Sequence, residues 1–427
     1  MHDDLRRLVH EGVEQVRPAA TDLVRQLVAT PSITGDEAAA QQVVAEALAD
    51  LGLEVDAWSP TREELAEHPS FSDDGLALGD RPVVVGRLAG ATDAPPLVLN
   101  GHVDVVPVGD EAGWPVSPWN DRLDGSVLRG RGTCDMKGGL VAGIAAVHAL
   151  LRLGLEPPVP VLVQSVIGEE TGGVGTLAAV LRGHTGAAAI VLEPTRLHRC
   201  PVGAGAASFR LHVPGRAAHG AMRAEGVSAV DKFVPLLAAM AELERARHAD
   251  FEHPAYGPHD LVAPISVGRV SSGDWPSTVP EALVAEGRFG VLPGETLDEA
   301  RRRLEATIAD TAATDDWLAA HPPVVEWFEG QFAPALTPVD HPLIAAVGAA
   351  HDAVVGTPSP VHGVPYGSDL RFFTNDADMP AVLYGPGDVA VAHTVDEHVD
   401  LDEVFAAAEV VALTILGWEP SVEEDGR

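Results

Sequence analysis

The chain alternates between stretches with helical spacing of apolar residues and short apolar runs. The helical stretches lie at residues 3–29, 36–51, 137–153 and 173–181. The short runs are rich in valine and isoleucine and predict strands at residues 82–88, 96–100, 159–167 and 187–192. Strands that alternate with helices are typical of a mostly parallel sheet covered by helices on both faces. We therefore predict an α/β domain.

Residues 203–330 follow a different order. The elements predicted there are strands at 206–213, 263–271, 281–291 and 323–329, with helices at 226–247 and 296–313. This βαββαβ order matches a ferredoxin-like unit. A chain of 427 residues is too long for one compact core. We therefore predict a larger domain in two parts, residues 1–202 and 331–427, with residues 203–330 inserted between them.

Three further segments complete the predicted organisation. Residues 59–80 contain several Pro, Asp and Glu and predict a surface loop that borders the pocket of the larger domain. After the Pro-rich segment 333–342 the α/β pattern returns and ends in a helix at 401–416. The tail from Glu419 is expected to be disordered.

Composition and charge narrow the class of partner. The formal net charge of −35 argues against sequence-independent binding to nucleic acid or to anionic membranes. No apolar run reaches the length that spans a bilayer, and the first 30 residues suggest a polar helix rather than a leader. The two cysteines provide no disulfide framework. We expect a cytoplasmic protein without a nucleic-acid or membrane partner.

Side chains with metal-binding chemistry follow the predicted strands. His102 comes directly after the run at 96–100, and Asp104 lies two residues further on. The Asp104 carboxylate could accept a proton from the far ring nitrogen of His102 and so fix the imidazole tautomer. Asp135 lies in a glycine-rich stretch, where glycine allows a close backbone approach. Two neighbouring metal ions need a bridging carboxylate, and Asp135 is the candidate.

Three more carboxylates and a second histidine complete the set. Glu169, Glu170 and Glu193 each come just after a predicted strand, and His393 follows a Gly-Pro-Gly turn. Buried carboxylates need partners, so we expect one glutamate of the adjacent pair to bind metal and the other to take a proton from water. Ligands gather at the carboxyl ends of strands in such sheets. The sequence therefore predicts a two-metal hydrolase site.

These motifs, in this order, resemble those of the M20 family of metallopeptidases and deacylases. The family includes acetylornithine deacetylase, succinyl-diaminopimelate desuccinylase, aminoacylases and glutamate-releasing carboxypeptidases. The resemblance extends from residue 20 to residue 416. It implies a zinc-peptidase-like catalytic domain with a mostly parallel central sheet, made of residues 1–202 and 331–427. It also implies that residues 203–330 form a ferredoxin-like α+β dimerisation (lid) domain of a homodimer.

The resemblance implies a role for each site residue. The implied ligands are His102, Asp135 and Glu193 for one zinc ion, and Asp135, Glu170 and His393 for the other. Asp135 would bridge the two ions, for which cobalt or manganese could substitute. Glu169 would be the general acid/base, and Asp104 would orient His102. A cis peptide between Asp135 and Met136 is implied as well.

The resemblance also implies substrate contacts. The residue that matches His219 crosses a dimer interface in related enzymes and hydrogen-bonds the developing oxyanion. Arg371 would grip a substrate carboxylate, near the backbone N–H groups of Gly385 and Gly387. Many relatives have an asparagine before the Val-Pro of the lid, whereas residues 273–280 have none. This Gly-Asp-Trp-Pro-Ser-Thr-Val-Pro stretch looks more like a deacylase/deformylase branch, which leaves the substrate open.

The predicted protein is a dinuclear zinc-dependent amidohydrolase. It would remove an acyl group from an N-acyl amino acid or a related small amide by metal-activated water. One alternative is an M20 carboxypeptidase or dipeptidase, in which the same residues would release a C-terminal amino acid from a peptide. The other alternative is a catalytically silent metal- or peptide-binding protein. Loss of Glu169 or of one metal ligand would indicate such a protein, but the chain has all of them.

Overall fold

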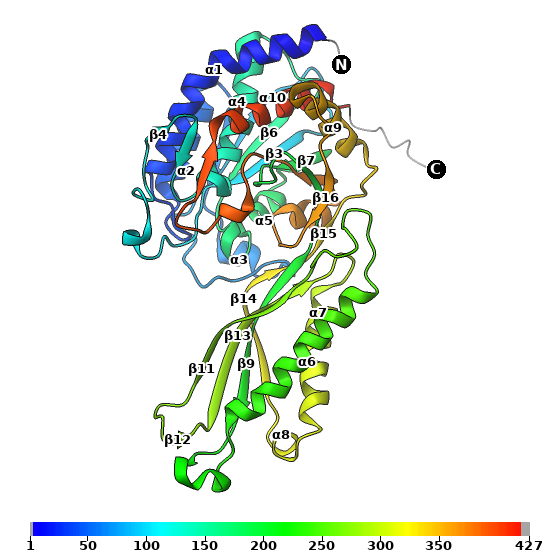
Figure 1. Cartoon of the computed structure of the whole chain (residues 1–427). Helices are drawn as coiled ribbons and strands as arrows, with labels where there is room; N and C mark the ends of the chain where they lie inside the picture. The colour runs from blue at the N-terminus through cyan, green and yellow to red at the C-terminus, as the bar shows by residue number, and fades with distance from the viewer. Residues whose placement is uncertain (1–2, 420–427) are drawn as a thin grey trace. The chain divides into compact units, whose positions relative to one another are not determined.

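The computed structural model describes residues 3–419, apart from the side chain of Glu329 (Figure 1). Beyond Glu419, the tail that the sequence predicts to be disordered lies outside the described residues. The chain divides into two compact units. The first comprises Met1–Pro201, Leu336–His362 and Ser368–Arg427, and the second comprises Val202–Ala335 and Gly363–Gly367. The second unit contains the predicted insert and extends past its predicted end at residue 330.

A mixed sheet forms the centre of the first unit. Within residues 3–419 it has nine strands, eight of them in the order β1-β2-β6-β3-β7-β17-β8-β15, with β16 paired to β8. The strands are β1 (Glu54–Trp58), β2 (Val83–Leu88), β3 (Leu97–His102), β6 (Val161–Val166), β7 (Ala188–Val191), β8 (Arg199–Gly203), β15 (Ala335–Leu336), β16 (Val361–Val364) and β17 (Ala381–Leu383). The central strands β6, β3, β7 and β17 are parallel, whereas β1, β2 and β8 pair antiparallel. The carboxyl ends of the central strands therefore meet at one edge of the sheet.

Helices cover this sheet. They are α1 (Asp3–Ala29), α2 (Ala38–Asp50), α3 (Arg62–Leu65), α4 (Gly138–Leu153), α5 (Val174–Leu181), α9 (Pro342–Val355) and α10 (Leu401–Gly417). Figure 1 shows α1, α4 and α10 side by side, and α4 packs against both of the others. A small antiparallel sheet consists of β18 (His398–Asp400), β5 (Val127–Arg129) and β4 (Leu123–Asp124), with β5 paired to both of the others. The mostly parallel α/β core is confirmed.

The helix α4 corrects one sequence-based expectation. With the turn before it, the segment Thr133–Leu153 is long and apolar enough to cross a membrane by length and composition. The expectation that no segment reaches that length is therefore wrong. Of its most apolar window, 78% is buried inside the protein. A helix that is apolar on all sides is typical of a buried core position as well as of a membrane span, and α4 occupies the core position here.

The second unit has the predicted βαββαβ order. Its elements are β9 (Gly205–Pro214), α6 (Ala229–Ala249), β11 (Ile265–Ser272), β13 (Ala282–Val291), α7 (Leu297–Ala312), α8 (Asp316–Ala320) and β14 (Val324–Phe332). The antiparallel sheet has the order β11-β13-β9-β14. Figure 1 shows α6 and α7 along this sheet. The buried apolar cluster of this unit includes Phe209 and Phe289 of the sheet and Leu304 of α7. At the N-terminus of α7, Thr296 and Glu299 form a capping box.

Candidate metal centre

The site residues lie where the parallel strands end. His102 is the last residue of β3. Glu169 and Glu170 begin the short 3₁₀ turn Glu169–Thr171 after β6, and Glu193 follows β7. Because these strands are neighbours in the sheet, their ends converge. The structure thus brings together groups that are far apart in sequence.

The carboxylate of Asp135 lies between two histidines. His102 Nε2 is 3.1 Å from Asp135 Oδ1, and His393 Nε2 is 3.4 Å from Asp135 Oδ2. Each oxygen therefore faces a different imidazole. His393 Nε2 is also 3.1 Å from the Glu170 carboxylate. The peptide between Asp135 and Met136 is cis, as the family resemblance implied.

Two more carboxylates, those of Glu169 and Glu193, lie near the His102 ring. Ligand atoms of His102, Glu169 and Glu193 lie within 4.8 Å of one another, and so do those of His102, Asp135 and Glu170. All of these side chains are buried or nearly so, whereas His393 is half exposed. Imidazole nitrogens and carboxylate oxygens at this separation are the donor set of a dinuclear zinc or cobalt site. The residues present therefore fit two divalent ions.

Burial and the neighbouring charges shift the pKa values of the groups at this site. Burial raises the pKa of Glu169 and Glu193, and the neighbouring carboxylates raise each further. Hydrogen bonds to Asp135 and Glu170 raise the pKa of His393 to about 10. Burial opposes the ionisation of Asp135, but His102 and His393 outweigh it and lower its pKa. Such a concentration of negative charge favours cations at this position.

The role predicted for Asp104 needs a correction. His102 Nδ1 hydrogen-bonds the backbone carbonyl of Asp104 at 2.9 Å, whereas the carboxylate oxygen is 3.6 Å away. The carboxylate instead accepts the backbone N–H groups of Glu169 and Glu170, at 3.1 and 3.2 Å, and the Thr34 hydroxyl at 3.1 Å. Asp104 therefore fixes the imidazole through its main chain and the glutamate turn through its side chain.

The sequence motifs did not indicate a role for Glu397 or Arg131. One oxygen of the buried Glu397 side chain accepts the backbone N–H groups of Gly132, Cys134 and Asp135, at 2.9, 3.2 and 3.2 Å. The other pairs with Arg131 at 2.5 Å. Glu397 thus holds the loop that presents Asp135. The only sequence signal was that Glu397 lies four residues after His393, and an acid in a loop is ordinarily solvated.

Three groups predicted to bind substrate form hydrogen bonds within the protein itself. The Gly385 N–H donates to Thr195 Oγ1 at 3.1 Å, and the Gly387 N–H donates to Glu403 at 2.7 Å. Arg371 is buried and donates to the Gly172 carbonyl at 2.7 Å. The structure therefore does not support free glycine N–H donors for substrate. Arg371 supports the turn after Glu170 through that carbonyl.

His219 belongs to the second unit. It ends β10 (Ala218–His219), which pairs with β12 (Thr278–Val279). Its exposed ring accepts the backbone N–H of Ala221 at 3.2 Å through Nδ1. The oxyanion contact across a dimer stays a prediction.

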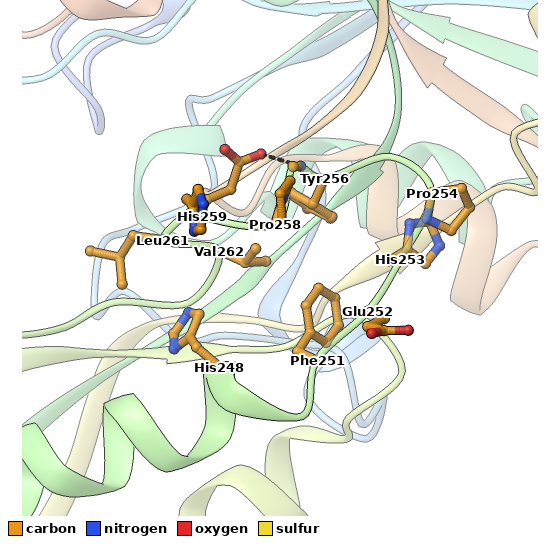
Figure 2. Close-up of a pocket in the computed structure, with 12 residues that line it drawn as sticks. His248, Phe251, Glu252, His253, Pro254, Tyr256, Pro258, His259, Leu261 and Val262 are labelled. Atoms are coloured by element: carbon orange, nitrogen blue, oxygen red, sulfur yellow. Dashed lines mark hydrogen bonds between the residues drawn. The ribbon is translucent and has the colours of Figure 1, made fainter.

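A separate cavity of about 670 Å³ lies within the second unit and is lined by residues 248–262 (Figure 2). Figure 2 shows His248, His253 and His259 on different sides of it. The His248 ring is saturated, because Nδ1 contacts the Glu244 carbonyl and Nε2 accepts the Ala263 N–H. Over residues 3–419, the only groups that converge as metal ligands are those around His102. Among the described residues that line this cavity, no set of metal ligands converges.

Comparison with known proteins agrees with this geometry. Residues 98–417 match the sequence profile of peptidase family M20/M25/M40. N-formyl-4-amino-5-aminomethyl-2-methylpyrimidine deformylase of Bacillus subtilis (strain 168) is 28% identical over 434 aligned positions, 97% of each chain.

Two solved structures share the fold. The dipeptidase Dug1p of Saccharomyces cerevisiae has a TM-score of 0.74 at 15% identity, covering 97% of this chain and 98% of its own. The YXEP protein of Bacillus subtilis, a dinuclear metal-binding M20 peptidase, has a TM-score of 0.61 at 16% identity, covering 95% and 99%. The chain belongs to peptidase family M20/M25/M40 and is a metal-dependent hydrolase of amide bonds.

Proposed function

We propose that the protein is a dinuclear amidohydrolase that removes an acyl group from an N-acyl amino acid or a related small amide. The observation that carries this proposal is the Asp135 carboxylate, whose two oxygens face His102 and His393 separately. A carboxylate placed in this way can bridge two ions. Glu193 would complete one ligand set and Glu170 the other. Two zinc ions suit the histidine and carboxylate donors, and cobalt or manganese could replace them.

The chemistry divides between the ions and Glu169. Bound divalent ions polarise a carbonyl and lower the pKa of water. Glu169 is assigned no ligand role in this proposal, and its carboxylate lies beside His102 and Glu193. It takes a proton from the attacking water and later gives that proton to the departing amine nitrogen. Burial, which raises the pKa of Glu169, brings its proton affinity closer to what this exchange requires.

The choice of an acyl group over a C-terminal amino acid rests on a relative matched over 97% of both chains. The Bacillus subtilis protein that matches 97% of the chain is named as a deformylase of an aminopyrimidine. The Dug1p likeness, at 15% identity, concerns the fold alone. Acyl removal from an amine is therefore favoured, and dipeptide hydrolysis is the second candidate.

A substrate panel tests this proposal. Zinc- or cobalt-loaded protein is assayed for amine release from N-formyl amines, N-acetyl and N-succinyl amino acids, and dipeptides. We expect turnover of an acyl class that disappears after chelation and returns when metal is added back. Turnover of dipeptides alone would favour the second candidate. Silence across the panel with metal bound would contradict the proposed hydrolase.

We also propose a homodimer formed through the second unit. On α6, Val230, Val234 and Leu237 are 42%, 61% and 43% exposed, and their spacing places them on one helical face. The strand β11 is an edge of the sheet, and its Val270 is 51% exposed. An unpaired edge beside an apolar stripe is suited to self-association. In such a dimer, His219 of one copy would serve the active site of the other copy, where it would hydrogen-bond the developing oxyanion.

Val234→Glu tests the dimer. A buried unpaired carboxylate in the interface is costly, so we expect the variant to sediment as a folded monomer. If the partner's His219 is needed, kcat falls as well. Val355→Glu, at a 41% exposed position of the first unit, should stay dimeric. A Val234→Glu variant that remains dimeric, or a monomeric wild-type protein, would contradict this interface.

A further inference from the structure

The turn that carries the two catalytic-site glutamates has little regular structure of its own. Gly168, Gly172 and Gly173 adopt positive φ angles of 65°, 140° and 70°, a backbone region that glycine enters freely. Within the turn, the Gly172 N–H bonds the Glu169 carbonyl and the Gly173 N–H bonds the Gly168 carbonyl. The direction of the Glu169 side chain therefore depends on contacts from outside the turn.

One such contact comes from the surface loop before β2. The Thr171 hydroxyl donates to Asp74 Oδ2 at 3.0 Å. Thr171 follows Glu170 directly, and the Asp74 side chain is only 7% exposed. The same loop touches the turn a second time at Gly172. A Cβ atom added to Gly172 would lie 2.7 Å from the Cβ of Ser72, so the loop packs directly against the glutamate turn.

Asp74 is itself held by a buried ion pair. Its Oδ1 accepts the Leu76 N–H at 2.9 Å, and Arg81 Nη1 lies 3.4 Å from its Oδ2. Arg81 donates to both oxygens of Glu37, at 2.8 and 2.7 Å. The Arg81 and Glu37 side chains are 2% and 0% exposed. A buried bidentate pair has a fixed geometry. Arg81 therefore holds the Asp74 carboxylate in one position, where it accepts the Thr171 hydroxyl.

Asp104 and Asp74 support the turn through different groups. Asp104 accepts the backbone N–H groups of Glu169 and Glu170, whereas Asp74 accepts the Thr171 side chain. Removal of one contact leaves the other in place. The Asp74 contact can therefore adjust the turn without dismantling the site.

We propose that the Asp74–Thr171 hydrogen bond positions Glu169 for proton transfer, with Arg81 orienting Asp74. Asp74 and Thr171 are then positioning residues supplied by the loop at residues 59–80. The inference rests on the proposed function of Glu169 as the proton carrier. A base displaced by a fraction of an ångström loses rate rather than substrate affinity.

The test compares Thr171→Val with Thr171→Ser at saturating zinc. Valine keeps the shape and removes the hydroxyl, whereas serine keeps the hydroxyl. We expect Thr171→Val to lower kcat by about 10-fold or more, the scale of lost outer contacts at metal sites, with KM, metal content and melting temperature unchanged. Thr171→Ser should recover most of kcat. Thr92→Val removes a comparable hydroxyl contact, to the Pro158 carbonyl, and should leave kcat unchanged.

Two more variants, Asp74→Ala and Glu169→Gln, distinguish failure of this inference from failure of the proposed function. Asp74→Ala should reproduce the loss, and its combination with Thr171→Val should lower kcat little further, because each variant alone already removes the Asp74–Thr171 hydrogen bond. If Thr171→Val does not fold, the kcat of Asp74→Ala tests whether the hydrogen bond positions Glu169. Wild-type kcat in Thr171→Val, or equal losses in the valine and serine variants, would overturn the inference. Retained turnover in Glu169→Gln would instead overturn the proposed function.

Discussion

Glu169→Gln is expected to lower kcat by about 10²–10⁴-fold, the usual contribution of a general acid/base, while the protein keeps both metal ions. Glutamine preserves the shape of the side chain but cannot take a proton from water. The ligands proposed for the two ions, Asp135, Glu170 and Glu193 among them, are untouched. Steady-state amine release measures the fall in kcat, and metal analysis of the same preparation measures whether both ions are kept.

The metal content decides between two roles for Glu169. Its carboxylate lies within ligand distance of His102 and Glu193, so it could in principle bind an ion instead. Loss of one ion from Glu169→Gln would assign it as a ligand, and near-wild-type turnover would exclude it as the base. Glu156→Gln, at an exposed position of the same unit, is the control and should behave as wild type.

Asp135→Asn is expected to weaken both metal sites together. The amide lacks the negative charge, and only one of its two terminal atoms is an oxygen acceptor. Since His102 and His393 face opposite oxygens of Asp135, no single orientation of asparagine serves both. We expect metal affinity to fall by more than the roughly 10–100-fold typical of outer contacts, with turnover lost.

Glu193→Gln provides the comparison for this variant. Glu193 belongs to only one proposed ligand set, so its loss should leave about one ion per chain. Metal analysis after dialysis distinguishes the two variants, and thermal unfolding shows whether each is folded. Equal metal contents in Asp135→Asn and Glu193→Gln would contradict the bridging role.

The part of the site that could be predicted from the sequence consists of residues that follow the predicted strands. His102, Glu169 and Glu193 could be placed together because each follows a short apolar run, and parallel strands bring their carboxyl ends to one edge. The βαββαβ order of the second unit could be predicted for a similar reason, since its helical and alternating patterns are distinct. The assignment of each ligand to an ion came from the family resemblance.

The missed features depend on contacts that spacing does not encode. Glu397 reaches the loop of Asp135 only because the chain returns there more than 260 positions later. Whether Asp104 offers His102 its carbonyl or its carboxylate depends on local backbone direction. The Gly385 and Gly387 N–H groups were expected to be free, but side chains from two other segments accept them. Long-range polar partners are therefore what the sequence pattern leaves undetermined.

The most direct test of the dinuclear site is a metal titration. Metal-free protein receives increasing equivalents of zinc while the rate of amine release is followed on the best substrate of the panel. The proposed site predicts that activity rises until about two equivalents per chain are bound. Full activity with one equivalent, or activity that does not respond to metal, would contradict it.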